Sequence, residues 1–203
     1  MTGRPERDID GVGRSHVRLL ATAAGIDDAI AGQPSLLPEW DVAMLVTHLA
    51  RNADGLADVA SRAVIDDLEV AIERLESTWA ALPAEAWSAA GLSATGEPEP
   101  LAEAPRNRWR EVEVHHADLG LAFTADDWDE VFVDLELERW MAGLERRLPP
   151  GAGALVLAAD TGRSWLAGGP TVTMRVEAPS RRLLAWLIGR GAGDLPEIRP
   201  WDW

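Results

Sequence analysis

The sequence contains no cysteine and no lysine, and each absence limits what the protein can do. Without cysteine the chain can form no disulfide and offers no thiolate as a metal ligand or nucleophile. Any metal would therefore be held by nitrogen and oxygen atoms, and any thiol chemistry would need a thiol from outside the chain. Arginine supplies every fixed positive side-chain charge, which together with abundant alanine and glycine indicates a GC-rich bacterial coding sequence.

Long apolar runs and clusters of positive charge are also missing. No run of about 18 apolar residues occurs and the polar start of the chain lacks the apolar core of a signal peptide, so we expect no membrane span and a cytoplasmic location. The net charge of −15 argues against a nucleic-acid partner, because binding phosphates requires clustered basic residues. At 203 residues, 47% of them hydrophobic, the chain is long enough to bury a core.

Apolar residues recur at helical spacing through the first part of the chain. This spacing predicts four antiparallel helices. The first spans residues 6–31, the second begins after an N-cap at Asp41, the third spans residues 66–82 and the fourth begins near Arg106. Residues 83–105 are rich in proline and glycine and are predicted to form a loop. The first domain, residues 1–124, is therefore expected to be a four-helix bundle.

The pattern changes at about Ala125. Apolar alternation and turn residues predict a helix over residues 127–147, strands over 154–159, 164–167 and 172–178, and a last helix over 181–188 capped by Ser180. These elements describe a small α/β domain over residues 125–203. The predicted fold class is α+β.

The stretch from Arg110 to Gly120 carries the strongest chemical signal. Glu111 and His115 are four residues apart, so both side chains leave one face of the helix, whereas Glu113 points to the far side. His48 lies in the apolar stripe of the second helix and could supply a third ligand. A carboxylate and two imidazoles on facing helices can hold a divalent metal with one position open.

Spacing alone leaves other interpretations open. A glutamate and a histidine at this spacing more often make a surface contact, and a single histidine in an apolar stripe is more often a core residue. Asp118 either accepts a hydrogen bond from a metal-binding imidazole or simply ends the helix. His16 is exposed or packed in the core, with a smaller chance of lining the site, and His116 is expected to pack inside the bundle.

Three segments together suggest a family. Ser35–Trp40, Thr47–Ala53 and Arg110–Gly120 resemble the mycothiol-dependent maleylpyruvate isomerase family, which belongs to the DinB-like superfamily of metal-binding four-helix bundles. The segment Leu184–Gly191 looks like the last helix of that family and its Gly-Arg-Gly turn. The link at about Ser61–Asp66 looks shorter than in relatives, so the substrate can differ.

The resemblance implies Zn²⁺ bound by His48, Glu111 and His115, and mycothiol as a thiol cosubstrate. It implies that Arg190 is an active-site arginine that reaches an anionic substrate or the cosubstrate. Asn52 and Asp118 match recurrent motif positions without a defined role. The sequence does not identify the residues that would bind mycothiol.

The activity implied by the resemblance is a cis–trans isomerisation. The thiolate would add to the double bond of maleylpyruvate, the resulting single bond would rotate, and loss of the thiol would leave fumarylpyruvate. Two alternatives stay open: a mycothiol S-transferase that conjugates another electrophile, and a non-catalytic metal-binding module. The expected partners are a small-molecule electrophile and a low-molecular-weight thiol, and the chain is expected to be a monomer.

Overall fold

The structure is a computed structural model that describes residues 4–54, 63–92, 98–191 and 193–200. The chain divides into two compact units, Met1–Thr124 and Ala125–Trp203. Of the link expected at Ser61–Asp66, residues 61 and 62 lie outside the described residues, and Ala63 already begins a helix. Within the described ranges, no helix combines the length and the apolar character needed to cross a bilayer.

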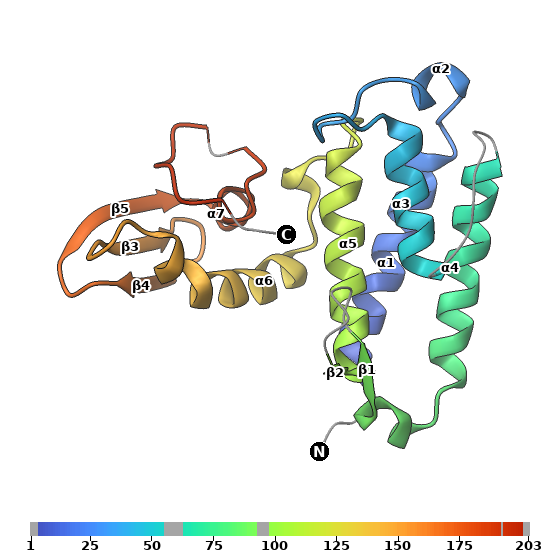
Figure 1. Cartoon of the computed structure of the whole chain (residues 1–203), viewed down its shortest axis with the longest axis horizontal. Coiled ribbons are helices and arrows are strands. Elements are labelled where there is room, and N and C mark those ends of the chain that lie inside the picture. Colours follow the sequence, from blue (N-terminus) through green and yellow to red (C-terminus); the bar gives the residue numbers. More distant parts are fainter. Residues whose placement is uncertain (1–3, 55–62, 93–97, 192, 201–203) are drawn as a thin grey trace. The chain divides into compact units, whose positions relative to one another are not determined.

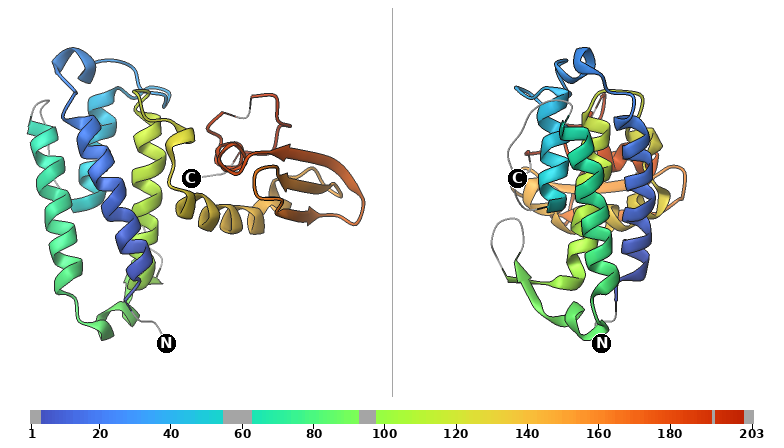
Figure 2. Two further views of the ribbon diagram at one scale, coloured as in Figure 1. Left: turned by 180° about the vertical axis from the view of Figure 1, so that it is seen from behind. Right: turned by 90° about the vertical axis from the view of Figure 1, so that its right-hand side faces the viewer.

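Four helices lie side by side in the first unit (Figures 1 and 2). Their bounds are Glu6–Ala23 for α1, Val42–Asp54 for α3, Ala63–Ala81 for α4 and Ala104–Asp118 for α5. Helix α3 packs most extensively on α4, and α1 on α5. Aliphatic side chains from all four helices make up the core, among them Leu19, Leu45, Leu49, Leu68, Ile72 and Val112. The expectation of an α+β fold that begins with a helical bundle is confirmed.

Two details of the predicted bundle are wrong. Helices α3 and α4 run in the same direction, opposite to α1 and α5 (Figure 1), because helical spacing identifies a buried face but not the direction of the chain. The first predicted helix is also two helices, since α1 ends at Ala23 and the short α2 spans Asp28–Ala31. The side chain of Asp27 caps α2 by accepting hydrogen bonds from the backbone of Ala29 and Ile30.

The connector before α3 ties this helix to the end of α5. Asp41 caps α3 as predicted, because its carboxylate accepts a hydrogen bond of 2.7 Å from the backbone N–H of Met44. The backbone N–H of Leu36 donates to the carbonyl oxygen of Asp118 at 2.8 Å. The beginning of α3 and the last turn of α5 are therefore held close together, which brings the predicted ligand residues of both helices to one end of the bundle.

The segment predicted as a loop between α4 and α5 contains regular structure. The 3₁₀ helices η1 (Ala84–Ser88) and η2 (Leu101–Glu103) flank strands β1 (Ala90–Leu92) and β2 (Pro98–Pro100), which pair antiparallel. Proline was a misleading signal here. In a two-stranded sheet each strand has a free edge, so a residue without an N–H can be accommodated.

The second unit combines helices with a three-stranded sheet. Its elements are η3 (Ala125–Asp127), α6 (Glu130–Gly143), η4 (Leu144–Arg147), β3 (Gly153–Ala158), β4 (Ser164–Gly168), β5 (Val172–Ala178) and α7 (Ser180–Leu187). Strand β3 lies in the middle of the sheet, antiparallel to β4 and parallel to β5. The helix predicted over residues 127–147 is α6 followed directly by η4, and it begins only at Glu130, after the cap Asp129.

Helix α7 leads to the Gly-Arg-Gly turn. The predicted cap by Ser180 is wrong: Ser180 is the first helical residue, and its N–H and hydroxyl both donate to the carboxylate of Asp160, at 2.9 and 2.8 Å. At the other end, the buried Arg147 donates a hydrogen bond to the carbonyl oxygen of Leu187. The backbone N–H of Arg190 then donates to the carbonyl oxygen of Ala185 at 2.8 Å, which closes the turn.

Candidate metal centre

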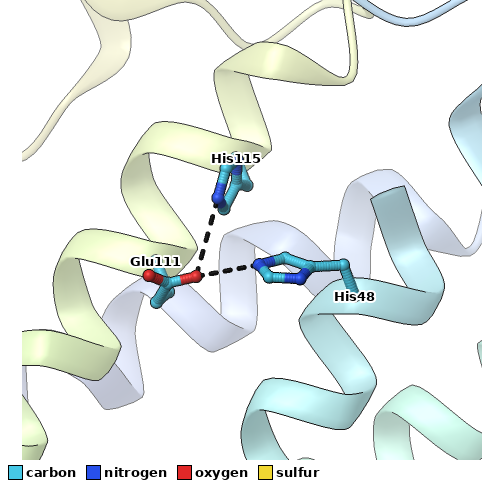
Figure 3. A group of neighbouring side chains, drawn as sticks. All are labelled: His48, Glu111 and His115. Atoms are coloured by element: carbon cyan, nitrogen blue, oxygen red, sulfur yellow. Dashed lines mark hydrogen bonds and ion pairs between the residues drawn. The ribbon is translucent and has the colours of Figure 1, made fainter. Parts of the chain in front are cut away.

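His48, Glu111 and His115 form one cluster between α3 and α5 (Figure 3). One potential ligand atom from each residue lies within 4.8 Å of those of the other two. The Nε2 atom of His48 is 3.0 Å from Oε2 of Glu111, and Nε2 of His115 is 3.6 Å from the same oxygen. The carboxylate therefore stands between two imidazole nitrogens, with all three donors turned toward a common centre.

The helices place these side chains for simple geometric reasons. Glu111 and His115 are one turn apart on α5, so they project from the same face. On α3, Leu45 and Leu49 are fully buried in the bundle core and fix the rotation of the helix, which turns His48 toward α5. The side chain of His48 is 37% exposed, more than its predicted place inside an apolar stripe implies. The cluster therefore has an accessible side.

Asp118 orients one of the imidazoles. Its carboxylate is almost completely buried, and Oδ2 lies 2.9 Å from Nδ1 of His115. An ionised carboxylate can only accept, so the proton of a neutral His115 belongs on Nδ1, and Nε2 keeps its lone pair toward Glu111. Contacts of this kind fix the tautomer and orientation of metal-binding histidines.

Aromatic rings hold the other imidazole. Trp40 packs against the ring of His48 in an edge arrangement, with the ring centroids 5.6 Å apart. The rings of His48 and His115 are themselves nearly perpendicular, with centroids 4.9 Å apart. His48 is thus confined between Trp40 and His115, which reduces the freedom that it would lose on binding an ion.

The charge state of Glu111 suits a cation. Burial by itself would raise the pKa of Glu111, but the hydrogen bond with His48 and the nearby His115 and Arg108 outweigh burial and lower this pKa below its ordinary value. Glu111 is consequently ionised at neutral pH. Its carboxylate is a hard anionic donor beside two imidazoles.

The donor set and its spacing fit zinc. Zinc–ligand bonds of about 2.1 Å in tetrahedral geometry place neighbouring ligand atoms about 3.4 Å apart. The two contacts of Glu111, at 3.0 and 3.6 Å, lie on either side of that value. Two imidazoles and one carboxylate leave the fourth position open, as in catalytic rather than structural zinc sites. The described residues contain no other group of three or more potential ligands.

Two residues that the sequence placed near the site, Asn52 and His16, make hydrogen bonds with Arg108. Asn52 accepts a hydrogen bond of 2.8 Å from Nη1 of Arg108, and His16 lies buried with its Nε2 atom 3.2 Å from Nε of the same arginine. Arg108 itself was not predicted. It is buried, three residues before Glu111 on α5, and this position on the inward face is the only signal by which the sequence marks it.

His116 and Glu113 lie away from the cluster. The ring of His116 is stacked on Phe123 with centroids 3.8 Å apart, and its Nε2 atom is 2.7 Å from Oγ1 of Thr22. Glu113 contacts Ser15 and Arg18 of α1 instead of His115, in line with its predicted angle on the helix. Both residues pack within the bundle.

Arg190 belongs to the second unit. The structure shows how the turn holds it, through the backbone bond to Ala185 and a hydrogen bond of 3.1 Å from Nη1 to the carbonyl oxygen of Ile188. Its predicted place in an active site stays a prediction.

Comparison with known proteins gives the fold and the family. The chain resembles two crystal structures, one of the mycothiol-dependent maleylpyruvate isomerase and one of a mutant of that enzyme with a histidine replaced by alanine. In each case the TM-score is 0.82, the sequence identity is 21%, and 97% of both chains is covered. A search of curated proteins found no significant match.

The sequence also matches the family described as mycothiol maleylpyruvate isomerase N-terminal domain, over residues 12–67 and 60–120. Together these matches span residues 12–120, more than half of the 203-residue chain, and they include all three residues of the cluster. The chain therefore belongs to the mycothiol maleylpyruvate isomerase N-terminal domain family.

Proposed function

We propose that this chain is a zinc- and mycothiol-dependent isomerase that converts maleylpyruvate to fumarylpyruvate. The observation that carries the proposal is the cluster of His48, Glu111 and His115, whose donor atoms lie within 4.8 Å of one another. Family membership and the likeness to the solved isomerase along 97% of each chain support the same reaction class.

The residues of the cluster have distinct roles in this proposal. His48 and His115 would present neutral nitrogen donors, with Asp118 keeping the proton of His115 on Nδ1. Glu111 would supply the negative charge, since its lowered pKa leaves it ionised at neutral pH. Zinc held by these residues would lower the pKa of a thiol, so that the reactive thiolate exists at neutral pH.

Because the chain has no cysteine, the thiol has to be supplied from outside it. Its sulfur would form a bond to one carbon of the cis double bond, and the displaced electron pair would move to the neighbouring carbonyl oxygen as an enolate. After rotation about the new single bond, the pair would return, the carbon–sulfur bond would break and the same thiolate would leave. The thiol is regenerated and no oxidant or reductant is needed.

Arg190 is proposed to bind a carboxylate of the substrate. A guanidinium can donate two parallel hydrogen bonds to a carboxylate and offset the negative charge of the enolate. Arg190→Ala is expected to keep one zinc per chain and to lower kcat/KM by about 100-fold or more. Metal analysis and steady-state kinetics measure the two effects, and loss of zinc in this variant would contradict the assigned role.

The decisive experiment supplies the purified protein with mycothiol and maleylpyruvate. We expect fumarylpyruvate to form while the thiol concentration stays constant, and the rate to depend on zinc. Consumption of one thiol per turnover with another electrophile would identify an S-transferase instead. If the protein binds zinc but shows no thiol-dependent turnover with either class of substrate, both the isomerase and the S-transferase hypotheses are contradicted.

A further inference from the structure

A continuous chain of hydrogen bonds crosses the bundle beside the metal cluster and joins all four helices. Glu76 of α4 lies 2.7 Å from Nδ1 of His16 on α1, and Nε of Arg108 on α5 lies 3.2 Å from Nε2 of the same ring. Nη1 of Arg108 then donates to two acceptors on α3, the carbonyl oxygen of Leu49 at 2.9 Å and Oδ1 of Asn52 at 2.8 Å.

The direction of each hydrogen bond follows from the donors. A guanidinium can only donate, so Nε2 of His16 must be the acceptor. The imidazole proton therefore lies on Nδ1 and is donated to Glu76. Burial of His16, together with the charge of Arg108, lowers its pKa despite the contact with Glu76, which agrees with a neutral ring. Every link of the chain thus has one defined donor and one defined acceptor.

Within this series of hydrogen bonds, Arg108 is the residue that joins α5 to α3, the two helices that carry the cluster. On its own helix, Arg108 precedes Glu111 by three residues, and the two side chains leave the same face. Of its two acceptors on α3, Leu49 directly follows His48 in the sequence and Asn52 lies one turn beyond it. One planar group thereby connects the part of α3 that holds His48 to the part of α5 that holds Glu111.

Packing alone does not account for a buried arginine at this point. Burial lowers the pKa of Arg108 to about 10, which reflects the cost of removing its charge from water. An apolar residue of similar volume commonly serves stability equally well or better. An apolar side chain has no rigidly spaced N–H donors, and such donors can fix the distance between two helices.

We propose that Arg108 is a positioning residue that sets the spacing of His48 from Glu111 and His115, with Asn52 and His16 as its partners. The consequence for metal binding rests on the proposed zinc site. Arg108 touches neither the metal nor the substrate in this assignment. Its effect is on the geometry that the two helices present to the ion.

The test compares matched variants on α5, with zinc and cobalt as probes. Arg108→Lys keeps the positive charge, but one ammonium nitrogen cannot replace both Nε, which contacts His16, and Nη1, which donates to Leu49 and Asn52. Arg106→Lys is the control, because Arg106 lies on the same helix and bonds to Asp8 on α1, at 3.3 Å, instead of to α3. Asn52→Ala removes one link of the chain and leaves the arginine in place.

We expect Arg108→Lys to raise the zinc Kd by about tenfold or more and to change the visible absorption spectrum of the cobalt-substituted protein, which reports coordination geometry. Asn52→Ala should shift both readouts in the same direction by a smaller amount, and Arg106→Lys should resemble the wild type. A folded Arg108→Lys protein with the wild-type zinc Kd and cobalt spectrum would overturn the proposal. If that variant does not fold, Asn52→Ala decides, and wild-type behaviour of this variant would overturn it equally.

A metal-free measurement separates this inference from the proposed function. If the wild-type protein binds no divalent metal, the proposed zinc site fails, yet the spacing of the helices can still be tested. Amide hydrogen exchange in residues 45–52 of α3 should then be faster in Arg108→Lys than in the wild type and unchanged in Arg106→Lys. Equal exchange in all three proteins would show that Arg108 does not position α3.

Discussion

Glu111 and Glu113 stand two residues apart on α5, yet their carboxylates have opposite surroundings. Glu111 is 28% exposed and lies between the imidazoles of His48 and His115. Glu113 is completely buried against α1 and accepts hydrogen bonds from Ser15, Arg18 and Trp109. The same chemical group thus occupies an accessible side and a closed side of one helix.

The two pKa values move in opposite directions. Burial is the largest influence on both carboxylates and would raise both values. At Glu111 the contacts with His48, His115 and Arg108 outweigh burial, so the pKa is lowered. At Glu113 burial outweighs the hydrogen bonds and the charge of Arg18, so the pKa is raised.

The kind of partner decides which carboxylate can serve a metal. A neutral imidazole donates an electron pair, so the two imidazoles beside Glu111 can act as further ligands for a cation. Arg18 beside Glu113 keeps its charge and cannot act as a ligand, and a cation there would be repelled. Burial of a carboxylate is therefore a poor guide to a metal site, whereas the identity of its hydrogen-bond partners is a good one.

The largest effect is expected when the carboxylate on the accessible side is replaced. Glu111→Gln removes the anionic ligand, and a neutral amide is not among the usual zinc ligands. The zinc Kd should rise by more than about 100-fold, beyond the range seen for residues that only support a ligand. Competition with a chelator of known affinity measures this change. Zinc binding of wild-type strength in this variant would exclude Glu111 as a ligand.

The matched change on the closed side should affect stability instead. Glu113→Gln leaves Arg18 without its anionic partner, although an amide oxygen can still accept from Ser15. We expect the free energy of unfolding of the metal-free protein to fall by about 2 kcal/mol, with the zinc Kd within about twofold of the wild type. Denaturant titration measures the free energy of unfolding. A large loss of zinc affinity would mean that the two sides of α5 are not independent.

A smaller effect is expected from the residue that supports His115. Asp118→Asn keeps an oxygen near Nδ1 of His115 but removes the negative charge that strengthens this hydrogen bond. The zinc Kd should rise by about tenfold, the lower end of the range for such supporting residues. The same chelator competition measures it. A change as large as that of Glu111→Gln would instead indicate that Asp118 binds the metal directly.

Much of the architecture follows from the sequence, because apolar spacing reports which face of each helix is buried. The α+β class and most of the elements were predicted in this way. Glu111 and His115 share a face in any helix, so their proximity could be derived without a structure. The parallel direction of α3 and α4 could not, since spacing within an element carries no information about how elements are connected.

The buried charges were the main omission. Arg108 and Glu113 are both almost fully buried, although charged residues are usually solvated. Helix α5 packs on both α1 and α3, and each of its residues is at least partly buried. No fully exposed face therefore distinguishes its polar residues from its apolar ones. The contacts of Glu113 with Ser15 and Arg18 stabilise one of these charges inside the bundle. The hydrogen bonds of Arg108 to Leu49 and Asn52 stabilise the other.

The smallest expected effect is a pH dependence at His16, a third titratable group enclosed in the same bundle. Burial lowers its pKa below the ordinary value of 6.5, and both neighbours that face the ring, Glu76 and Arg108, hold it in one neutral tautomer. The unfolded chain therefore takes up a proton at higher pH than the folded chain. The contribution of the neutral His16 to the free energy of unfolding is fully present above pH 6.5, and it is lost as the pH falls toward the lowered pKa.

His16→Gln isolates this contribution. Glutamine can still donate to Glu76 and accept from Arg108, but it does not titrate. Denaturant unfolding of the metal-free proteins between about pH 5 and 7.5 should show the wild type losing more stability than His16→Gln as the pH falls. The titrations of Glu111 and Glu113 occur in both proteins and cancel in the difference. A difference in the free energy of unfolding that does not change with pH would mean that His16 titrates alike in the folded and unfolded chain, and its assignment as a buried neutral link between α1 and Arg108 would be wrong.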